Sequence, residues 1–249
     1  MASQDLLTVD RAIRSLITIA ERAPTTAGEV AECLGTPLST TYRYISSLRK
    51  HGLVWALADQ TLAPGPRCVQ LERAFTRTFQ RSTYRAVMER VAQETGETVA
   101  LLVPQNGEAI CIDTVESSLP LRYTFSRGVA KSMLRGASAK AMLPWLDQEW
   151  LAGYIGASDE LTPEQRERLE DELPLIRERG YATSLGEIDA GVWAVGAPVF
   201  KANGGLDASL SVIAPHFRVE GREEQIISLA VAAARELSES NYWGSDDAA

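Results

Sequence analysis

The sequence predicts two domains joined by a linker helix: a mainly helical N-terminal domain with a small β wing, and a C-terminal α+β domain with an antiparallel sheet. Two helical patterns meet at a single glycine within residues 26–50, and a short strand-turn-strand pattern follows them. Beyond residue 84, short strands joined by hairpin turns alternate with helices. We place the boundaries at 1–67 for the N-terminal domain, 68–83 for the linker helix and 84–249 for the C-terminal domain.

Length and charge agree with this division. A chain of 249 residues, 45% of them apolar, is long enough for two cores. The net charge is −8, but residues 1–81 carry ten Lys and Arg against seven Asp and Glu. The remaining fifteen basic and twenty-six acidic residues give residues 82–249 a charge of −11. An acidic body with a mildly basic head is typical of a protein whose head alone contacts nucleic acid.

The first two helices are predicted from caps and apolar spacing. Thr8 or Asp10 can cap the first helix, and Pro24 ends it. Thr26 and Glu29 form a capping box that opens a short second helix, in which Val30, Ala31 and Leu34 are expected to be buried. The residues expected on the buried side of the first helix are Val9, Ile13, Leu16, Ile17 and Ala20.

A third helix is predicted over residues 36–50, directly after Gly35, with Thr36 as its N-cap and Pro37 in the first helical position. Its opposite face has hydroxyls, a phenol and cations but no carboxylate, which suits phosphates and base edges. A polar surface helix that binds nothing is the alternative. The expected buried residues of this helix are Leu38, Thr41, Tyr44, Ile45 and Leu48.

The strand pattern that follows predicts a wing. Residues 53–57 and 61–63 read as two strands, and Ala58, Asp59 and Gln60 form the turn between them. A short helix, a turn with glycine, a second helix and then a hairpin together make a winged helix-turn-helix.

These N-terminal motifs resemble the winged helix-turn-helix domain of the IclR family of bacterial transcriptional regulators. The matching segments are Val9-Asp10-Arg11-Ala12, Leu34-Gly35-Thr36-Pro37-Leu38-Ser39-Thr40-Thr41-Tyr42-Arg43, Gly52-Leu53-Val54 and Gly65-Pro66-Arg67. The resemblance implies that the third helix enters the major groove of operator DNA. The wing departs from the family, because its turn has no cation and Pro64 replaces a larger aliphatic residue.

Residue chemistry then assigns roles on the DNA. Arg43 suits a bidentate contact to guanine or a phosphate clamp, and Tyr42 a thymine methyl or a phosphate. Ser39 and Thr40 suit phosphate binding near the helix N-terminus. Surface ion pairs are the alternative for Arg11 and Arg67. The candidate DNA-binding residues are Arg11, Thr26, Ser39, Thr40, Tyr42, Arg43 and Arg67.

In the C-terminal domain we expect helices over about 84–95, from 136, over 162–179 and over 219–240. The expected strands are 98–104, 109–115, 121–125, 181–184, 192–200 and 206–213. Asn106-Gly107 is a strong hairpin signal, and Thr162 with Gln165 forms a second capping box.

The resemblance to the IclR family continues through this domain. Residues 134–141 and 179–200 follow family segments, with Lys201 in place of the usual acidic or amide residue. The resemblance implies a GAF-like effector-binding domain whose small-molecule pocket lies between the sheet and the loops of these segments, and Glu187 and Asp189 would flank the pocket or hold its loop. Hydroxyls and an apolar wall suit a small organic or aromatic acid. Trp193 either stacks on the ligand or packs in the core, and packing is favoured. The candidate effector-binding residues are Ser138, Ser184, Val192, Trp193, Ala194 and Ser211.

We therefore interpret the chain as a non-enzymatic transcriptional regulator that binds palindromic double-stranded operator DNA as a homodimer or homotetramer. The resemblance to the IclR family implies that it is a repressor. We expect a cytoplasmic protein without membrane contact, because there is no signal peptide or apolar run of spanning length and the three cysteines form no paired motif. No metal or cofactor is expected, since the two histidines belong to no ligand motif. The alternatives are a ligand-independent DNA-binding protein with an oligomerisation module and a hydrolase.

Overall fold

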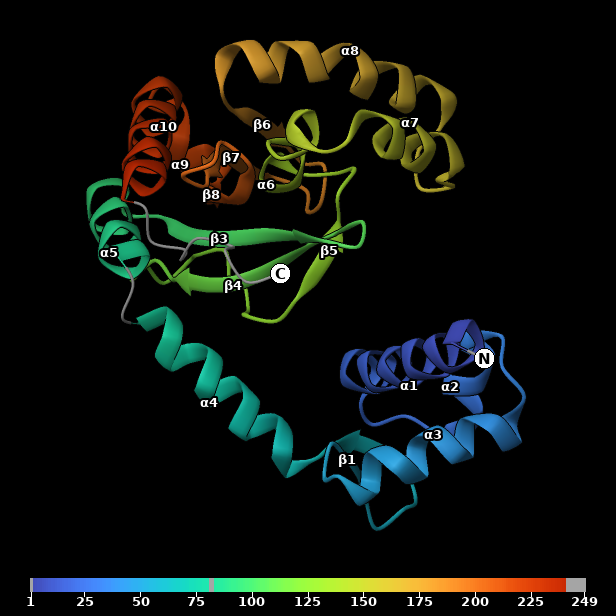
Figure 1. The fold of residues 1–249 in the computed structure, drawn as a ribbon. Helices are drawn as coiled ribbons and strands as arrows, with labels where there is room; N and C mark the ends of the chain where they lie inside the picture. Colours follow the sequence, from blue (N-terminus) through green and yellow to red (C-terminus); the bar gives the residue numbers. More distant parts are fainter. Residues whose placement is uncertain (1, 81–82, 241–249) are drawn as a thin grey trace. The chain divides into compact units, whose positions relative to one another are not determined.

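The structure is a computed structural model that describes residues 2–80 and 83–240 (Figure 1). The chain divides into two compact units, Met1–Arg81 and Ser82–Ala249. We call them the head and the body and describe each by itself.

The head contains the expected helix-turn-helix and wing. Its elements are α1 (Ala2–Arg22), α2 (Ala27–Leu34), α3 (Leu38–Lys50), β1 (Val54–Ala56), β2 (Leu62–Pro64) and α4 (Pro66–Gln80). The two wing strands pair antiparallel, and Thr25 forms an isolated bridge to Leu62 that ties the wing to the α1–α2 connection. The core is built from one apolar cluster that includes Ile19, Val30 and Ile45.

Local capping signals define the helix-turn-helix. The Glu29 amide donates to the Thr26 hydroxyl at 3.2 Å, and the Thr26 amide donates to the Glu29 carboxylate at 2.6 Å, so both groups of the predicted capping box are in place. Gly35 ends α2 in the left-handed region (φ 58°), where a side chain would be strained. This glycine lets α3 begin after only three residues.

The buried side of α1 differs from the expected one. The helix begins at Ala2 rather than at Thr8 or Asp10. Val9, Ile13 and Ile17 are about half exposed, whereas Ser15 and Ile19 are fully buried. Burial of Ser15 is tolerated because its hydroxyl donates to the Arg11 carbonyl at 2.8 Å. Of the stripe expected to face the core, Leu16 packs against the head core, and the rest is an exposed surface of the head.

Helix α3 begins one residue later than expected. Pro37 takes the N-cap position, and the Thr36 hydroxyl is 2.8 Å from that of Thr41. Leu38 is exposed, while the other four residues predicted to be buried, Thr41, Tyr44, Ile45 and Leu48, are in the core. His51 caps the C-terminal end.

The body is built on one antiparallel sheet of six strands in the order β5-β4-β3-β8-β7-β6. The Asn106-Gly107 turn joins the first two strands in sequence, with both residues at positive φ as the hairpin signal predicts. The strands are β3 (Thr98–Gln105), β4 (Glu108–Val115), β5 (Ala130–Ser132), β6 (Ala182–Leu185), β7 (Val192–Phe200) and β8 (Leu206–Pro215).

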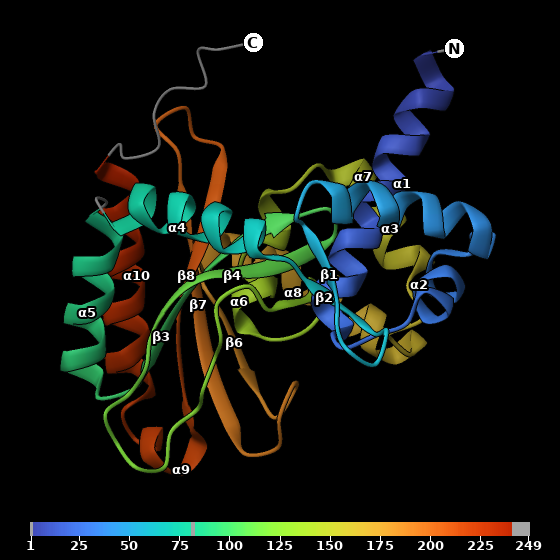
Figure 2. The ribbon, with the colours of Figure 1, turned by 90° about the horizontal axis from the view of Figure 1, so that it is seen from below.

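Helices cover this sheet. α5 and α10 pack together on one side, and α6 lies against β7 from the other, with α7 and α8 beyond it (Figures 1 and 2). The Thr162 capping box and the left-handed Gly180 bound α8 as expected, whereas α7 was not anticipated. The helices are α5 (Thr83–Thr95), α6 (Ala137–Lys140), the 3₁₀ turn η1 (Leu143–Trp145), α7 (Gln148–Ala157), α8 (Pro163–Arg179), α9 (His216–Val219) and α10 (Glu223–Glu239).

The strand expected over residues 121–125 is wrong, because this segment is irregular and the edge strand forms later, at β5. Side chains satisfy its backbone in place of a strand partner. The Thr98 hydroxyl donates to the Tyr123 carbonyl at 2.6 Å, and the Arg218 guanidinium donates to the Leu121 carbonyl. We call residues 116–129 the β4–β5 loop.

Candidate DNA-binding face and ligand cavity

The exposed side of α3 is a carboxylate-free polar surface. Ser39, Tyr42 and Arg43 are exposed, and Thr40 is half-buried. Among the residues that the structure describes, the Arg43 guanidinium forms no ion pair and no hydrogen bond. A cation that is free on a surface of hydroxyls can bind a phosphate or the edge of a guanine.

The three remaining candidates for DNA contact lie at other parts of the head. Arg11 is exposed on α1. Arg67 is exposed at the start of α4 and donates to the Gln70 side chain at 2.7 Å, and it forms no ion pair with the residues that the structure describes. The Thr26 hydroxyl is already part of the capping box. In the wing turn, the Asp59 carboxylate accepts from the Thr61 amide and hydroxyl, which adds negative charge and no cation.

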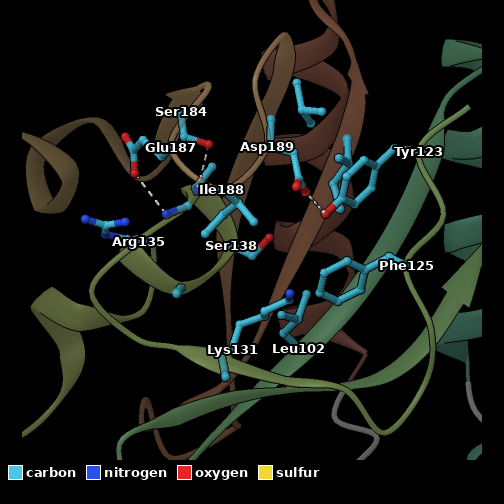
Figure 3. Close-up of a pocket in the computed structure, with 17 residues that line it drawn as sticks. Leu102, Tyr123, Phe125, Lys131, Arg135, Ser138, Ser184, Glu187, Ile188 and Asp189 are labelled. Carbon is cyan, nitrogen blue, oxygen red and sulfur yellow. Dashed lines mark hydrogen bonds between the residues drawn. The ribbon is translucent and has the colours of Figure 1, made fainter. Parts of the chain in front are cut away.

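The body contains a cavity between the sheet, α6 and two loops (Figure 3). One is the β4–β5 loop, and the other is the β6–β7 loop, residues 186–191. The free volume between the side chains is small, about 50 Å³. The cavity is lined by Leu102, Ala109, Tyr123, Phe125, Lys131, Arg135, Gly136, Ala137, Ser138, Ala139, Ser184, Glu187, Ile188, Asp189, Val192, Ala194 and Ile213.

Hydrogen bonds from the start of α6 fix one wall of the cavity. The Gly136 amide donates to the Glu187 carboxylate at 2.9 Å, and the Ala137 amide donates to the Ser184 hydroxyl at 3.0 Å. Lys140 is buried and contacts both Glu187 at 2.7 Å and Glu172 of α8 at 2.8 Å. Glu187 therefore holds the β6–β7 loop against α6, one of the two roles considered for it.

A side-chain hydrogen bond joins the two loops. The Tyr123 hydroxyl donates to the Asp189 carboxylate at 2.8 Å (Figure 3). Burial, followed by the bond to Asp189, raises the pKa of Tyr123 to about 12, so the phenol remains a donor at neutral pH. A ligand that enters between the loops meets this bond.

The close approach of α6 to the sheet depends on Gly196 in β7. A Cβ atom at this position would lie 2.5 Å from the Ala137 carbonyl oxygen and 2.9 Å from the Ser138 Cα. Both are backbone atoms that cannot turn aside. Gly196 therefore sets the depth at which α6 and Ser138 stand over the sheet.

Four of the six predicted effector-binding residues line the cavity: Ser138, Ser184, Val192 and Ala194. Trp193 does not, because successive residues of a strand point to opposite faces, and its side chain is buried on the other face of β7. This placement agrees with the packing role favoured for it. Ser211 is fully buried and pairs in register with Gly196, where the α6 backbone makes its close approach.

Several residues of the cavity were not anticipated. Tyr123 and Phe125 belong to the segment expected to be a strand, and Lys131 lies on an edge strand that no pattern predicted. The place of Ile213 in the cavity wall follows from the alternation of side chains along β8, but only once β8 is known to lie next to β7. Lys131 had no sequence signal, whereas Arg135 lies in the segment 134–141 that was expected beside the pocket but was not named as a candidate.

Each of the two units matches a domain of a known protein family. The model of the IclR helix-turn-helix domain matches residues 8–55, and that of the bacterial transcriptional regulator IclR C-terminal domain matches residues 75–239. The chain belongs to the IclR family. It is an IclR-type transcriptional regulator, with a DNA-binding head and an effector-binding body.

The similarity to individual relatives and solved structures extends over nearly the whole chain. The uncharacterised HTH-type transcriptional regulator RhmR of Escherichia coli K12 is 29% identical over 254 residues, which cover 98% of this chain and 97% of RhmR. An IclR transcriptional regulator from Silicibacter sp. TM1040 shares the fold with a TM-score of 0.84 at 22% identity, covering 94% of this chain and 96% of the other. An IclR homologue from Microbacterium hydrocarbonoxydans, solved with 4-hydroxybenzoate, has a TM-score of 0.73 at 20% identity and covers 94% and 98%.

Within residues 2–80 and 83–240, no group of three or more His, Cys, Asp or Glu side chains is placed to hold a metal ion. No helix in the same ranges is both long and apolar enough to cross a bilayer.

Proposed function

We propose that this regulator binds a palindromic operator as a homodimer or a dimer of dimers, and that a small organic or aromatic acid in the body cavity changes the operator affinity. Repression is the sign we propose, because a protein that occupies an operator excludes other proteins from that DNA. The observation that carries the DNA-binding part is the exposed face of α3, which has no carboxylate and on which Arg43 pairs with no residue that the structure describes.

The proposed contacts divide into specificity and affinity. Arg43 and Tyr42 read base edges from α3, while Ser39 and Thr40 bind phosphate near its N-terminus. Arg11, Arg67 and Thr26 are proposed phosphate contacts outside this helix. Of these, Thr26 is the weakest candidate, because its hydroxyl already accepts a hydrogen bond from the Glu29 amide.

Exposed apolar side chains on the head support self-association. Ile13 and Ile17 of α1 are about half exposed, as are Leu71 and Phe75 of α4. Monomeric proteins seldom expose such stripes, and a second copy of the chain would cover them. Two heads would then read two half-sites related by the protein's two-fold symmetry.

The ligand class follows from the cavity. Apolar side chains such as Leu102, Phe125 and Ile213 dominate its walls, and hydroxyls, two cations and two carboxylates supply the polar groups. The 4-hydroxybenzoate bound by the Microbacterium protein of the same fold is an aromatic acid of this class. The small free volume favours a ligand of few atoms.

The experiment compares Arg43→Ala with wild type on the native operator by footprinting and fluorescence anisotropy. We expect Arg43→Ala to lose the footprint and to reduce the slope of log K against log salt by about 1 if the guanidinium contacts a phosphate. Arg235→Ala removes an exposed cation from α10 of the body and serves as the matched control, with an unchanged footprint. A normal footprint for Arg43→Ala would contradict the assignment of α3.

The ligand-independent alternative predicts a different result. If the body is only an oligomerisation module, no acid changes the operator affinity of the wild-type protein. A screen of small acids in the same anisotropy assay decides between the two proposals.

A further inference from the structure

The cavity contains a lysine ammonium that no described carboxylate pairs with. Lys131 lies on the edge strand β5, opposite Ala109 of β4, and its side chain is half-buried. Figure 3 shows its terminal nitrogen inside the cavity, beside Phe125 and Leu102. Within residues 2–80 and 83–240 the ammonium forms no ion pair and no hydrogen bond.

The acidic side chains of the cavity are already engaged elsewhere. Glu187 contacts Lys140 and accepts from the Gly136 amide. Asp189 accepts from the Tyr123 hydroxyl on the side of the cavity away from Lys131 (Figure 3). A partly desolvated ammonium among apolar side chains is unfavourable unless an anion pairs with it. The chain leaves this anion to be supplied from outside.

A second polar group of the cavity is also free. The Ser138 hydroxyl faces the cavity in Figure 3 and has no hydrogen-bond partner in the described part of the chain. An ammonium and a hydroxyl that face one cavity can together bind the two oxygens of a carboxylate.

We propose that Lys131 binds the carboxylate of the effector and makes the cavity selective for monocarboxylates. This inference rests on the proposed function, since it concerns the same cavity. Asp189 places negative charge at the β6–β7 loop, whereas Glu187 is paired with Lys140, so a second carboxylate on the ligand meets repulsion from Asp189 there. An apolar body between the two ends contacts Phe125 and Leu102. The effector is thus an apolar molecule with one carboxylate at the Lys131 end and a neutral opposite end.

Isothermal titration calorimetry on the full-length protein tests the inference with matched acids and amides. The probes are propionate and propionamide, benzoate and benzamide, 4-hydroxybenzoate and 4-hydroxybenzamide, and the dicarboxylate terephthalate. We expect at least one monocarboxylate to bind wild type about 10- to 100-fold more tightly than its amide, the range of one charge-assisted hydrogen bond. Terephthalate should bind more weakly than benzoate.

Variants then assign the selectivity to Lys131. Lys131→Met should weaken binding of the acid by about 10- to 100-fold and leave the affinity for the amide unchanged, so that the preference for the acid is lost. Lys131→Arg keeps the positive charge and should retain the preference for the acid over the amide. Lys201→Met, at the β7–β8 turn outside the cavity, is the control and should bind as wild type does.

The outcomes separate this inference from the proposal on which it rests. If an acid binds wild type and Lys131→Met equally well, the role of Lys131 is wrong and the acid effector stands. If an amide binds wild type as tightly as its acid, the selectivity for a carboxylate is overturned. If no probe binds, both the inference and the small-acid effector fail.

Discussion

Replacement of Gly196 by alanine tests whether β7 sets the position of the cavity wall. The added Cβ would lie 2.5 Å from the Ala137 carbonyl oxygen, 2.8 Å from the Ala137 carbonyl carbon and 2.9 Å from the Ser138 Cα. Favourable carbon contacts lie at about 3.5–4.0 Å, so α6 must retreat by roughly 1 Å. The retreat weakens the bonds from Gly136 to Glu187 and from Ala137 to Ser184 that hold the β6–β7 loop.

The expected cost combines two opposing effects. Overpacking a core costs about 1–3 kcal/mol, and loss of glycine flexibility in the unfolded chain offsets about 0.4–1 kcal/mol of it. We expect the body of Gly196→Ala to lose about 1–2 kcal/mol of unfolding free energy. Ligand affinity should fall as well, because Ser138 moves with α6.

Urea unfolding, monitored by circular dichroism, measures the stability. Calorimetric titration with an acid that binds wild type measures the ligand affinity. Gly153→Ala is the matched control, because its Cβ meets no atom within 4 Å and the residue is exposed in α7. Alanine in a helix should stabilise this variant by up to about 1 kcal/mol. The reasoning is refuted if Gly196→Ala unfolds at the wild-type urea concentration and binds the acid normally.

Three further predictions concern stability and reactivity. Lys140→Met leaves Glu172 and Glu187 without their shared cation and should cost about 1–3 kcal/mol in urea unfolding of the body, less than a fully buried pair because both carboxylates are partly exposed; an unchanged midpoint would show that the cluster is neutral. Thr26→Ala removes the capping box and should destabilise the head by about 1 kcal/mol, with Thr8→Ala as a comparison inside α1. Burial raises the pKa of Cys111 to about 12, so the thiol stays protonated at pH 9. Iodoacetamide followed by mass spectrometry should label the exposed Cys33 long before Cys111, and equal labelling would contradict the burial of β4.

The head was largely predictable because short-range signals define it. The Thr26 capping box and Gly35 bound α2 through contacts within a few residues, so the pattern alone was enough to place the helix-turn-helix. The side of α1 that faces the core was not predictable in the same way. Its apolar stripe, with Ile13 and Ile17, is exposed, and apolar spacing does not distinguish a stripe that meets the core from one that can meet another chain.

The cavity was predictable only in part, for two physical reasons. β7 is covered on both faces, so hydrophobicity does not tell which of Trp193 and Ala194 faces the ligand. The β4–β5 loop is held by long-range side-chain bonds, such as that from Thr98 to the Tyr123 carbonyl, which no local pattern reveals. The position of Tyr123 in the cavity depends on those bonds, and that of Lys131 depends on the pairing of the short edge strand β5 with β4.

The central claim is that ligand in the body cavity controls operator binding by the head. The most direct test measures the operator dissociation constant by fluorescence anisotropy, with and without a saturating acid that calorimetry has shown to bind. Wild type is compared with Ala194→Leu, which fills the cavity from β7. We predict that the acid changes the operator affinity of wild type, whereas Ala194→Leu binds the operator but does not respond to the acid. An unchanged wild-type affinity, or a full response in Ala194→Leu, would contradict the account.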